Sequence, residues 1–244
     1  MSLSIKFWKK NSQNYIKLLE NTENFPSPYT HIIVPTLTKL IKQYSTKTSK
    51  IIDLGCGEGF LTRQIKPLRP KIVGCDISKE MVASAQKQSP HITYWVENIE
   101  HLKSIRSQKE YSLAFSTLVF HYLEHIDTAL TKIHRLLTDK GIFIVIIPHP
   151  CFYQQQNFDW FQAENSASYN LGDYFTEETT IRNIAHKYQT HHIHRTIGSY
   201  IRIFQQHHFN CLDILEPLPA SSPTKVLDKA THVPFLAFFV LQKN

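Results

Sequence analysis

A glycine-rich stretch, Ile51–Phe60 with the sequence IIDLGCGEGF, limits most strongly what this chain can fold into. Its first residues are mostly apolar and β-branched, as expected of a strand buried in a parallel sheet. Three of the seven glycines of the chain then follow within five positions. Glycine lets the backbone turn sharply and lets a ligand lie close to the main chain. The stretch therefore predicts a ligand site at the C-terminal end of a buried strand, next to a helix that begins there.

The spacing of the glycines and two acidic residues narrow the class of ligand. The dinucleotide fingerprint G-x-G-x-x-G would need glycine at position 60, where the chain has Phe60. Asp53 precedes the loop, and a buried acid there suits a cationic amine better than a pyrophosphate. Asp76 ends the next apolar run, roughly 20 residues past the loop, where a carboxylate accepts hydrogen bonds from both ribose hydroxyls. The two acids predict a nucleoside that carries an amine.

In these segments the sequence resembles the class I S-adenosylmethionine-dependent methyltransferases, in the small-molecule branch of the type 11/25 methyltransferase domains. The matching segments are DLGCGEG at 53–59, GCD at 74–76 and FSTLVFHYL at 115–123. The resemblance extends over about residues 50–150, and more loosely over 195–217. It implies S-adenosylmethionine as cofactor, S-adenosylhomocysteine as product, and methyl transfer to a small, apolar or aromatic acceptor.

The resemblance also implies which residues bind the cofactor. Asn98 stands where the family usually has an Asp that accepts from the adenine amine, and its amide oxygen still accepts one hydrogen bond without charge assistance. Ser116 and Thr117 are expected beneath the methionine portion. The complete set of expected cofactor-binding residues is Asp53, Gly55, Cys56, Gly57, Gly59, Asp76, Ile77, Asn98, Ile99, Ser116 and Thr117. Leu118 and Val119 replace the Asn-Pro-Pro-Tyr of amino-methylating relatives, which argues against adenine-N6 and glutamine methylation by that mechanism.

Methyl transfer needs few catalytic groups, because the sulfonium donor is already activated. Aligning the reactants in a dry pocket alone supplies roughly 7–11 kcal/mol, and a base is needed only if the acceptor arrives protonated. Histidine suits that task. The candidates at the active edge are His121, His149 and His194, of which we expect His149 first and His194 second. His194 lies in Ile193-His194-Arg195, which resembles a Tyr-His-Arg of small-molecule relatives. The expected substrate contacts are Tyr15, His121, Phe152 and Trp160, although the resemblance also fits a packing role for His121.

From residue 50 onward short apolar runs alternate with amphipathic segments, which is typical of parallel βαβ units. Expected strands are 50–54, 71–75, 92–96, 111–116, 142–147, 191–195, 211–216 and 235–241. Expected helices are 8–20, 31–44 with a kink at Pro35, 59–66, 79–88 capped by Ser78, 100–105, 126–137 and 197–208. We expect an α/β, Rossmann-like fold: a seven-stranded, mostly parallel sheet with helices on both faces, an antiparallel last strand and an aromatic insertion after the fifth strand. The expected domains are a helical cap at 1–49 and a methyltransferase domain at 50–244, with a lid at about 150–190.

The lid expectation comes from residues 152–175, which hold eight aromatics in 24 residues, against 12% aromatics in the whole chain. A loop with so many aromatic side chains is not expected to stay exposed to solvent. We therefore favour an acidic lid over the substrate, rather than plain core packing. Residues 151–181 also hold five acidic residues and no Lys or Arg. The overall net charge of +7 therefore leaves +12 on the rest, scattered without an Arg-rich run.

Three functions remain open on this basis. The first is a small-molecule methyltransferase, the second a tRNA or protein methyltransferase that uses the basic surface, and the third a non-catalytic cofactor-binding protein. No signal peptide or membrane-length apolar run stands out, and the four cysteines have neither C-x-x-C nor zinc spacing. We therefore expect a cytoplasmic protein with reduced thiols, no membrane partner and no metal. The acceptor atom and the oligomeric state are not encoded in these patterns.

Overall fold

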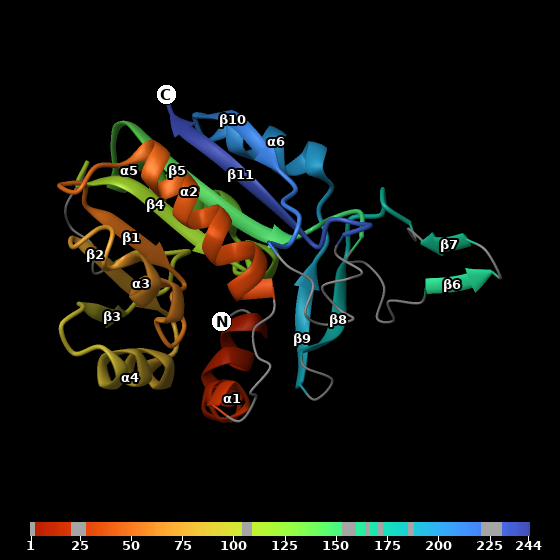
Figure 1. Ribbon diagram of the computed structural model, residues 1–244, viewed down its shortest axis with the longest axis horizontal. Coiled ribbons are helices and arrows are strands. Elements are labelled where there is room, and N and C mark those ends of the chain that lie inside the picture. Colours follow the sequence, from red (N-terminus) through yellow and green to blue (C-terminus); the bar gives the residue numbers. More distant parts are fainter. Residues whose placement is uncertain are drawn as a thin grey trace.

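A computed structural model of the chain describes residues 3–20, 28–103, 109–152, 160–163, 166–169, 173–184, 188–220 and 231–244. Its centre is a seven-stranded sheet with the strand order β10-β11-β5-β4-β1-β2-β3 (Figure 1). The strands are β1 (Ile51–Leu54), β2 (Ile72–Asp76), β3 (Tyr94–Val96), β4 (Tyr111–Thr117), β5 (Leu137–Pro148), β10 (Phe209–Leu215) and β11 (Leu236–Lys243). Strands β3, β2, β1, β4 and β5 pair in parallel, and β11 runs antiparallel to both β5 and β10. The predicted fold class is confirmed.

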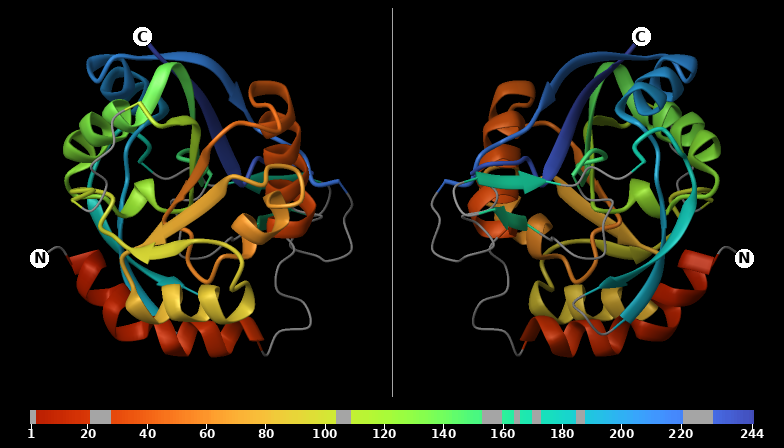
Figure 2. Two further views of the ribbon diagram at one scale, coloured as in Figure 1. Left: turned by 90° about the vertical axis from the view of Figure 1, so that its left-hand side faces the viewer. Right: turned by 90° about the vertical axis from the view of Figure 1, so that its right-hand side faces the viewer.

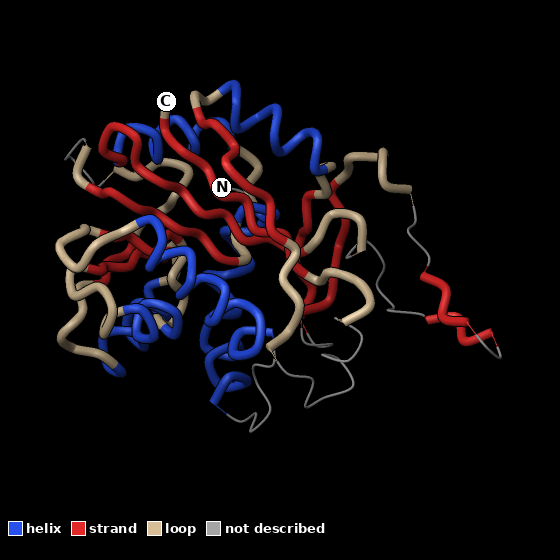
Figure 3. Tube along the Cα trace, turned by 45° about the horizontal axis from the view of Figure 1, so that its top comes forward, coloured by secondary structure: helices blue, strands red, loops and turns tan. Residues whose placement is uncertain are grey.

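Helices cover both faces of the sheet, so its central strands are buried on two sides (Figure 3). The helices are α1 (Leu3–Glu20), η1 (Tyr29–Ile33), α2 (Val34–Tyr44), α3 (Phe60–Ile65), α4 (Lys79–Gln88), η2 (Phe120–Tyr122), α5 (Ile126–Leu136) and α6 (Ile197–Gln206). One apolar core joins α5 and α6 to the sheet, and a second joins α2 and α3 to the opposite face. This double cover explains why β1 is a continuous apolar run apart from Asp53.

Two hairpins and the N-terminal helix lie outside this layered body. Helix α1 lies beside α4 and against β9 (Figure 2). The hairpins are β6 (Trp160–Ala163) with β7 (Ser166–Tyr169), and β8 (Thr179–Ile184) with β9 (Tyr188–Ile193). The first hairpin stands away from the sheet, whereas the second runs along its edge near α1 (Figures 1 and 3). Both fall within the predicted insertion after β5, and the boundaries of the expected cap and lid stay predictions.

The expected kink at Pro35 takes the form of a π-helical turn, η1, that runs directly into α2. Proline has no backbone N–H, so it cannot donate to the carbonyl four residues earlier, which is that of His31. The N–H of Ala220 donates to this carbonyl instead, at 2.7 Å. The loop after β10 is thereby attached to η1, directly before α2.

Three other expectations were inexact. Residues 99–101 form a turn, so the helix expected at 100–105 is absent from its described part. Strand β5 begins at Leu137, five residues before the strand expected at 142–147, and contains an irregularity at Lys140, which has φ +60°. Strand β8 was not predicted, because polar residues interrupt its alternation.

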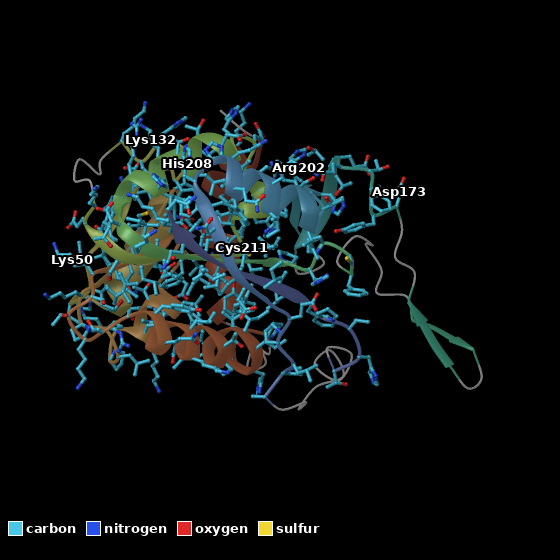
Figure 4. The ribbon with its side chains drawn as sticks, turned by 90° about the horizontal axis from the view of Figure 1, so that it is seen from above. Lys50, Lys132, Asp173, Arg202, His208 and Cys211 are labelled. Atoms are coloured by element: carbon cyan, nitrogen blue, oxygen red, sulfur yellow. The ribbon has the colours of Figure 1, made fainter. Side chains whose placement is uncertain are left out.

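The surface cations are spread over several elements. Lys50 precedes β1, Lys132 lies on α5 and Arg202 on α6, and the three occupy separate parts of the face in Figure 4. Asp173 lies apart from them, near the projecting hairpin (Figure 4). All four cysteines are free thiols, and no described helix is long and apolar enough to cross a membrane.

Ser78 caps α4 as predicted, since its Oγ accepts a hydrogen bond from the Met81 N–H at 3.2 Å. Replacing it, Ser78→Ala, is expected to lower the free energy of unfolding by about 1 kcal/mol, because the N–H loses its partner. Urea denaturation measures this. The matched control is Ser84→Ala inside the same helix, which should leave stability unchanged or slightly higher because alanine favours helix. Equal losses for the two variants would contradict a capping role.

Candidate active site

The glycine loop leaves β1 and turns under the end of β4. Gly55 has φ +83°, and a Cβ at this position would overlap the side chain of Val119. Gly57 has φ +55°, and a Cβ there would meet no heavy atom within 4 Å. Both positions favour glycine through their backbone conformation, but only Gly57 faces open space. That space is part of the cavity described below.

Asp76 ties this loop to the next strand and helix. Its Oδ2 accepts from the Gly57 N–H at 3.0 Å, and its Oδ1 accepts from the Ser78 N–H at 2.8 Å. Burial raises the pKa of the carboxyl, while these backbone hydrogen bonds act in the opposite direction. A carboxylate has about four lone-pair sites, and those not used by the backbone of Gly57, Ile77 and Ser78 remain for a ligand in the adjoining cavity.

The cavity has a volume of about 220 Å³ and lies at the C-terminal ends of the parallel strands. This is where ligands bind in open α/β sheets. Its walls come from the loops after β1 to β5, from α1 and from η1. The lining residues are Trp8, Tyr29, Gly55, Gly57, Asp76, Ile77, Met81, Glu97, Asn98, Ile99, Glu100, Thr117, Leu118, Val119, His121, Tyr122, Leu123 and Pro148.

The segment after β4 carries two features that are typical of a binding site. Thr117 is only 7% exposed, and its Oγ1 has no hydrogen-bond partner among the described residues. A buried hydroxyl without a hydrogen-bond partner destabilises the fold unless a ligand or a water molecule forms that hydrogen bond. Leu118 adopts φ +56°, a left-handed conformation that is rare for a residue with a Cβ. Its N–H donates to Ile146 at 2.8 Å, which turns the following residues along the cavity wall.

The loop after β3 brings further acidic side chains to the cavity. Asn98 Oδ1 accepts from the Glu100 N–H at 2.9 Å, and Glu97 Oε1 accepts from the Asn98 N–H at 3.0 Å. Glu100 Oε1 in turn accepts from the His125 N–H at 2.9 Å, which joins this loop to the start of α5. The amide oxygen of Asn98 therefore already serves the backbone, with one lone pair left for a ligand.

Comparisons with known proteins agree with this geometry. Residues 52–145 match a family described as a methyltransferase domain. Residues 52–145 therefore belong to the class I S-adenosylmethionine-dependent methyltransferases. The methyl donor is accordingly S-adenosylmethionine, and the resemblance seen in the sequence is confirmed.

Similar proteins span most of the chain. A Haemophilus influenzae protein described as uncharacterized is 26% identical over 94% of each chain. A malonyl-[acyl-carrier protein] O-methyltransferase of Bacillus cereus is 26% identical over 70% of this chain, and the match covers 65% of that relative, just under two thirds of its length. The crystal structure of an S-adenosylmethionine-dependent methyltransferase from Mesorhizobium loti superposes with a TM-score of 0.70 at 22% identity, covering 90% of this chain and 99% of that one. That likeness shows the shared fold.

Seven of the eleven cofactor residues predicted for this methyltransferase line the cavity: Gly55, Gly57, Asp76, Ile77, Asn98, Ile99 and Thr117. The other four lie behind the lining. Ser116 Oγ donates to the Leu54 carbonyl at 2.7 Å, Cys56 packs against α4, and Gly59 precedes α3. Asp53 is 1% exposed, and its Oδ2 accepts from Thr62 Oγ1 at 2.6 Å.

The two histidines predicted as bases, His149 and His194, also lie outside the lining of the methyltransferase cavity. His149 Nδ1 accepts from the Cys151 N–H at 3.2 Å, so its Nε2 carries the proton and donates to Glu216 at 2.6 Å. Burial lowers the pKa of His149 despite Glu216. His194 Nε2 lies 2.9 Å from the Tyr174 carbonyl. Their assignment as bases stays a prediction.

Of the predicted substrate contacts, His121 lines the cavity. Phe152 packs its ring 4.9 Å from that of His149, outside the lining. The side chains of Tyr15 and Trp160 lie outside the described residues. No group of three or more His, Cys, Asp or Glu in the described part of the methyltransferase is placed to hold a metal ion.

Sequence reasoning missed several lining residues. Glu97 and Tyr122 neighbour predicted residues, so extending each predicted segment by one position would have found them. Tyr29 and Met81 carried no recognisable signal. Trp8 was not missed, because the resemblance implied an N-terminal helix over the cofactor in which Trp8 could cap the site, with plain packing as the alternative. Its ring contacts that of Tyr122 edge-on at 5.9 Å, which closes one side of the cavity.

The buried carboxyl of Asp53 predicts how stability depends on pH. Desolvation raises its pKa from 3.8 to about 7, against the lowering effect of Thr62. Between these values the unfolded chain ionises first, so this group lowers the free energy of unfolding by about 1.4 kcal/mol per pH unit as pH rises. Above about pH 7 both states are ionised and the loss ends.

Between pH 5 and pH 7 the free energy of unfolding of Asp53→Asn should therefore fall less steeply with pH than that of the wild type. The expected difference in slope is about 1 kcal/mol per pH unit. Urea denaturation at the two pH values measures the difference. Asp139→Asn, at an exposed carboxyl paired with Lys109, is the control and should keep the wild-type slope. Identical slopes for the wild type and Asp53→Asn would refute the raised pKa.

Proposed function

We propose that this methyltransferase transfers the methyl group of S-adenosylmethionine to a small acceptor bound in the compartment between Trp8, His121 and Tyr122. The observation that carries the proposal is that one cavity joins these side chains to Gly57 and Asp76. A donor on the glycine loop and an acceptor in the aromatic compartment would share a single enclosed space. Exclusion of water and fixed orientation are the main requirements of this reaction.

The lining residues fit the polar groups of the cofactor. We assign the remaining lone-pair capacity of Asp76 to the ribose hydroxyls. The open lone pair of Asn98, with neighbouring Glu97, is assigned to the adenine amine. The hydroxyl of Thr117, which has no partner in the described part of the chain, is assigned to the methionine portion. Asp53 lies one layer behind, and because its pKa is raised to about 7, a nearby cationic amine would favour its ionised form.

The acceptor compartment has aromatic and histidine walls. Trp8 and Tyr122 meet edge-on at 5.9 Å, and His121 packs on Tyr122 with the ring centroids 3.9 Å apart. Such walls suit a flat or apolar acceptor with one polar reacting atom. The Bacillus cereus relative is a malonyl-[acyl-carrier protein] O-methyltransferase, and the acceptor in its name is not a nucleic acid.

The first experiment separates cofactor binding from transfer. Thermal denaturation with S-adenosylmethionine, S-adenosylhomocysteine or NAD should show stabilisation by the first two only. Labelled S-adenosylmethionine is then incubated with extract separated into metabolites, RNA and protein. Label in the metabolite fraction supports the proposal. Label in RNA or protein would replace it with the alternative that uses the basic surface, and binding without transfer would leave a non-catalytic binding protein.

Asp76→Ala tests the ribose assignment. The variant is expected to bind S-adenosylhomocysteine about ten- to a hundredfold more weakly, because hydrogen bonds to a charged group contribute about 1.5–3 kcal/mol. Isothermal titration calorimetry measures the affinity. Asp139→Ala, at an exposed carboxylate, should bind as the wild type does. Because Asp76 also holds the loop, a melting temperature close to that of the wild type is required, and unchanged affinity would rule out the assignment.

A further inference from the structure

His121 occupies a distinctive position among the histidines of the chain. It lies in η2, directly after the segment that leaves β4, and it lines the cavity although only 3% of it is exposed. By contrast, His149 and His194 are bound to Glu216 and to the Tyr174 carbonyl outside the lining. His121 thus presents an imidazole to the acceptor compartment from the strand edge that carries Thr117.

A second buried histidine supports the ring of His121. His192, on β9, is 7% exposed, and its ring centroid lies 5.0 Å from that of His121. The two rings are tilted by 39° to each other. Tyr122 packs on another side of His121 at 3.9 Å. Two aromatic neighbours therefore restrict the imidazole to a narrow range of orientations.

The residues that follow β9 connect His192 to the wall of the cavity. Arg195 Nη2 donates to the Leu123 carbonyl at 2.8 Å, and Leu123 lines the cavity two residues after His121. Thr196 caps α6 through Ser199, so the junction between β9 and α6 is held at a defined place. The insertion after β5 thus returns to the site through His192 and Arg195.

We propose that His121 is the catalytic residue that accepts a proton from the methyl acceptor, with His192 as the positioning residue behind it. This inference rests on the proposed function. The acceptor hydroxyl or protonated amine gives its proton to the imidazole of His121. Its lone pair forms a bond to the methyl carbon as the bond from that carbon to sulfur breaks, and the electron pair of the broken bond stays on sulfur as a neutral thioether.

The proposal defines the class of acceptor. A carboxylate is already ionised at neutral pH and needs no base, whereas a hydroxyl or an ammonium group must lose a proton before or during transfer. Histidine is the side chain whose ordinary pKa lies nearest to neutrality. The acidic groups Asp76, Glu97 and Glu100 line the same cavity and favour a neutral or cationic acceptor over an anionic one.

The pH dependence of transfer depends on every charged group that faces His121. Among the described residues, the titratable groups that contact His121 or share its cavity wall are His192 on β9, the three cavity carboxylates and the phenols of Tyr122 and Tyr29, with the guanidinium of Arg195 beyond Leu123. A base is active when deprotonated, so the rate should rise with pH through the titration of His121 and then level off.

One test needs no acceptor. The imidazole nitrogens of the full chain are labelled with ¹⁵N, and the His121 resonances are identified by their loss in His121→Asn. Addition of S-adenosylhomocysteine should shift the resonances of His121 and leave those of His134, which lies on α5 near His208, unchanged. Binding of S-adenosylhomocysteine with no shift at His121 would overturn the placement of this residue in the acceptor compartment.

The second test measures transfer to the fraction labelled by the wild type. His121→Asn and His121→Gln should lower the rate at least about a hundredfold, the lower range for loss of a general base, and remove its rise with pH. Affinity for S-adenosylhomocysteine should stay within about twofold, since binding is not the role of a base. His192→Phe keeps a ring behind His121 and should retain more activity than His192→Ala, and His134→Asn should match the wild type.

The outcomes separate the inference from the proposed function. The inference is overturned if folded His121 variants still transfer the methyl group at the wild-type rate. It is also overturned if the rise of the transfer rate with pH is lost in His149→Asn and kept in the His121 variants. Either outcome leaves the methyltransferase assignment of the cavity intact. A carboxylic acid as the labelled product also overturns the inference. A wild type that binds the cofactor but labels no fraction overturns both. If neither His121 variant folds, the comparison of His192→Phe with His192→Ala decides, and equal rates of transfer for these two variants overturn the inference.

Discussion

The hydrogen bonds of the Asp76 carboxylate hold the donor half of the site together. One oxygen accepts from the glycine loop after β1, and the other accepts from the start of α4 after β2. Two neighbouring strand ends are thereby joined through one side chain whose remaining lone pairs face the cavity. Because the carboxyl is buried, these backbone donors offset part of the desolvation that raises its pKa. The same contacts that fix the loop therefore keep Asp76 able to ionise.

Much of the donor half was predictable from sequence because its signals are local. The glycines, Asp76 and the strand ends follow one another within about fifty residues, and parallel strands bring their carboxyl ends to one edge. Asp53 was harder to place. Sequence position puts it beside the loop, but whether its side chain faces the cavity or Thr62 depends on which face of β1 it occupies. In a strand buried on both faces, the apolar pattern carries no such information.

The acceptor half was less predictable, since its residues come from segments that are far apart in the chain. Trp8, Tyr29 and Tyr122 meet only in the folded molecule, and neither composition nor spacing links them. His149 and His194 matched the expectation of a base at the active edge. The structure instead pairs them with Glu216 and Tyr174, because long-range partners decide where a buried imidazole turns. His121 was also a candidate base, but it ranked behind His149 and His194 because its motif fitted a packing role equally well. The position of β9 beside it separates the two roles, and sequence spacing does not predict that position.

The cavity is thus divided between one continuous stretch that serves the donor and several distant segments that form the opposite wall. Substitutions in α1, in η2 or along β9 would leave the carboxylate network of the glycine loop untouched. Members of a lineage built on this plan can exchange the wall for a new acceptor while inheriting an unchanged donor half. Their divergence should consequently concentrate in the N-terminal helix and in the insertion after β5, where a graft from one member to another would carry specificity with it.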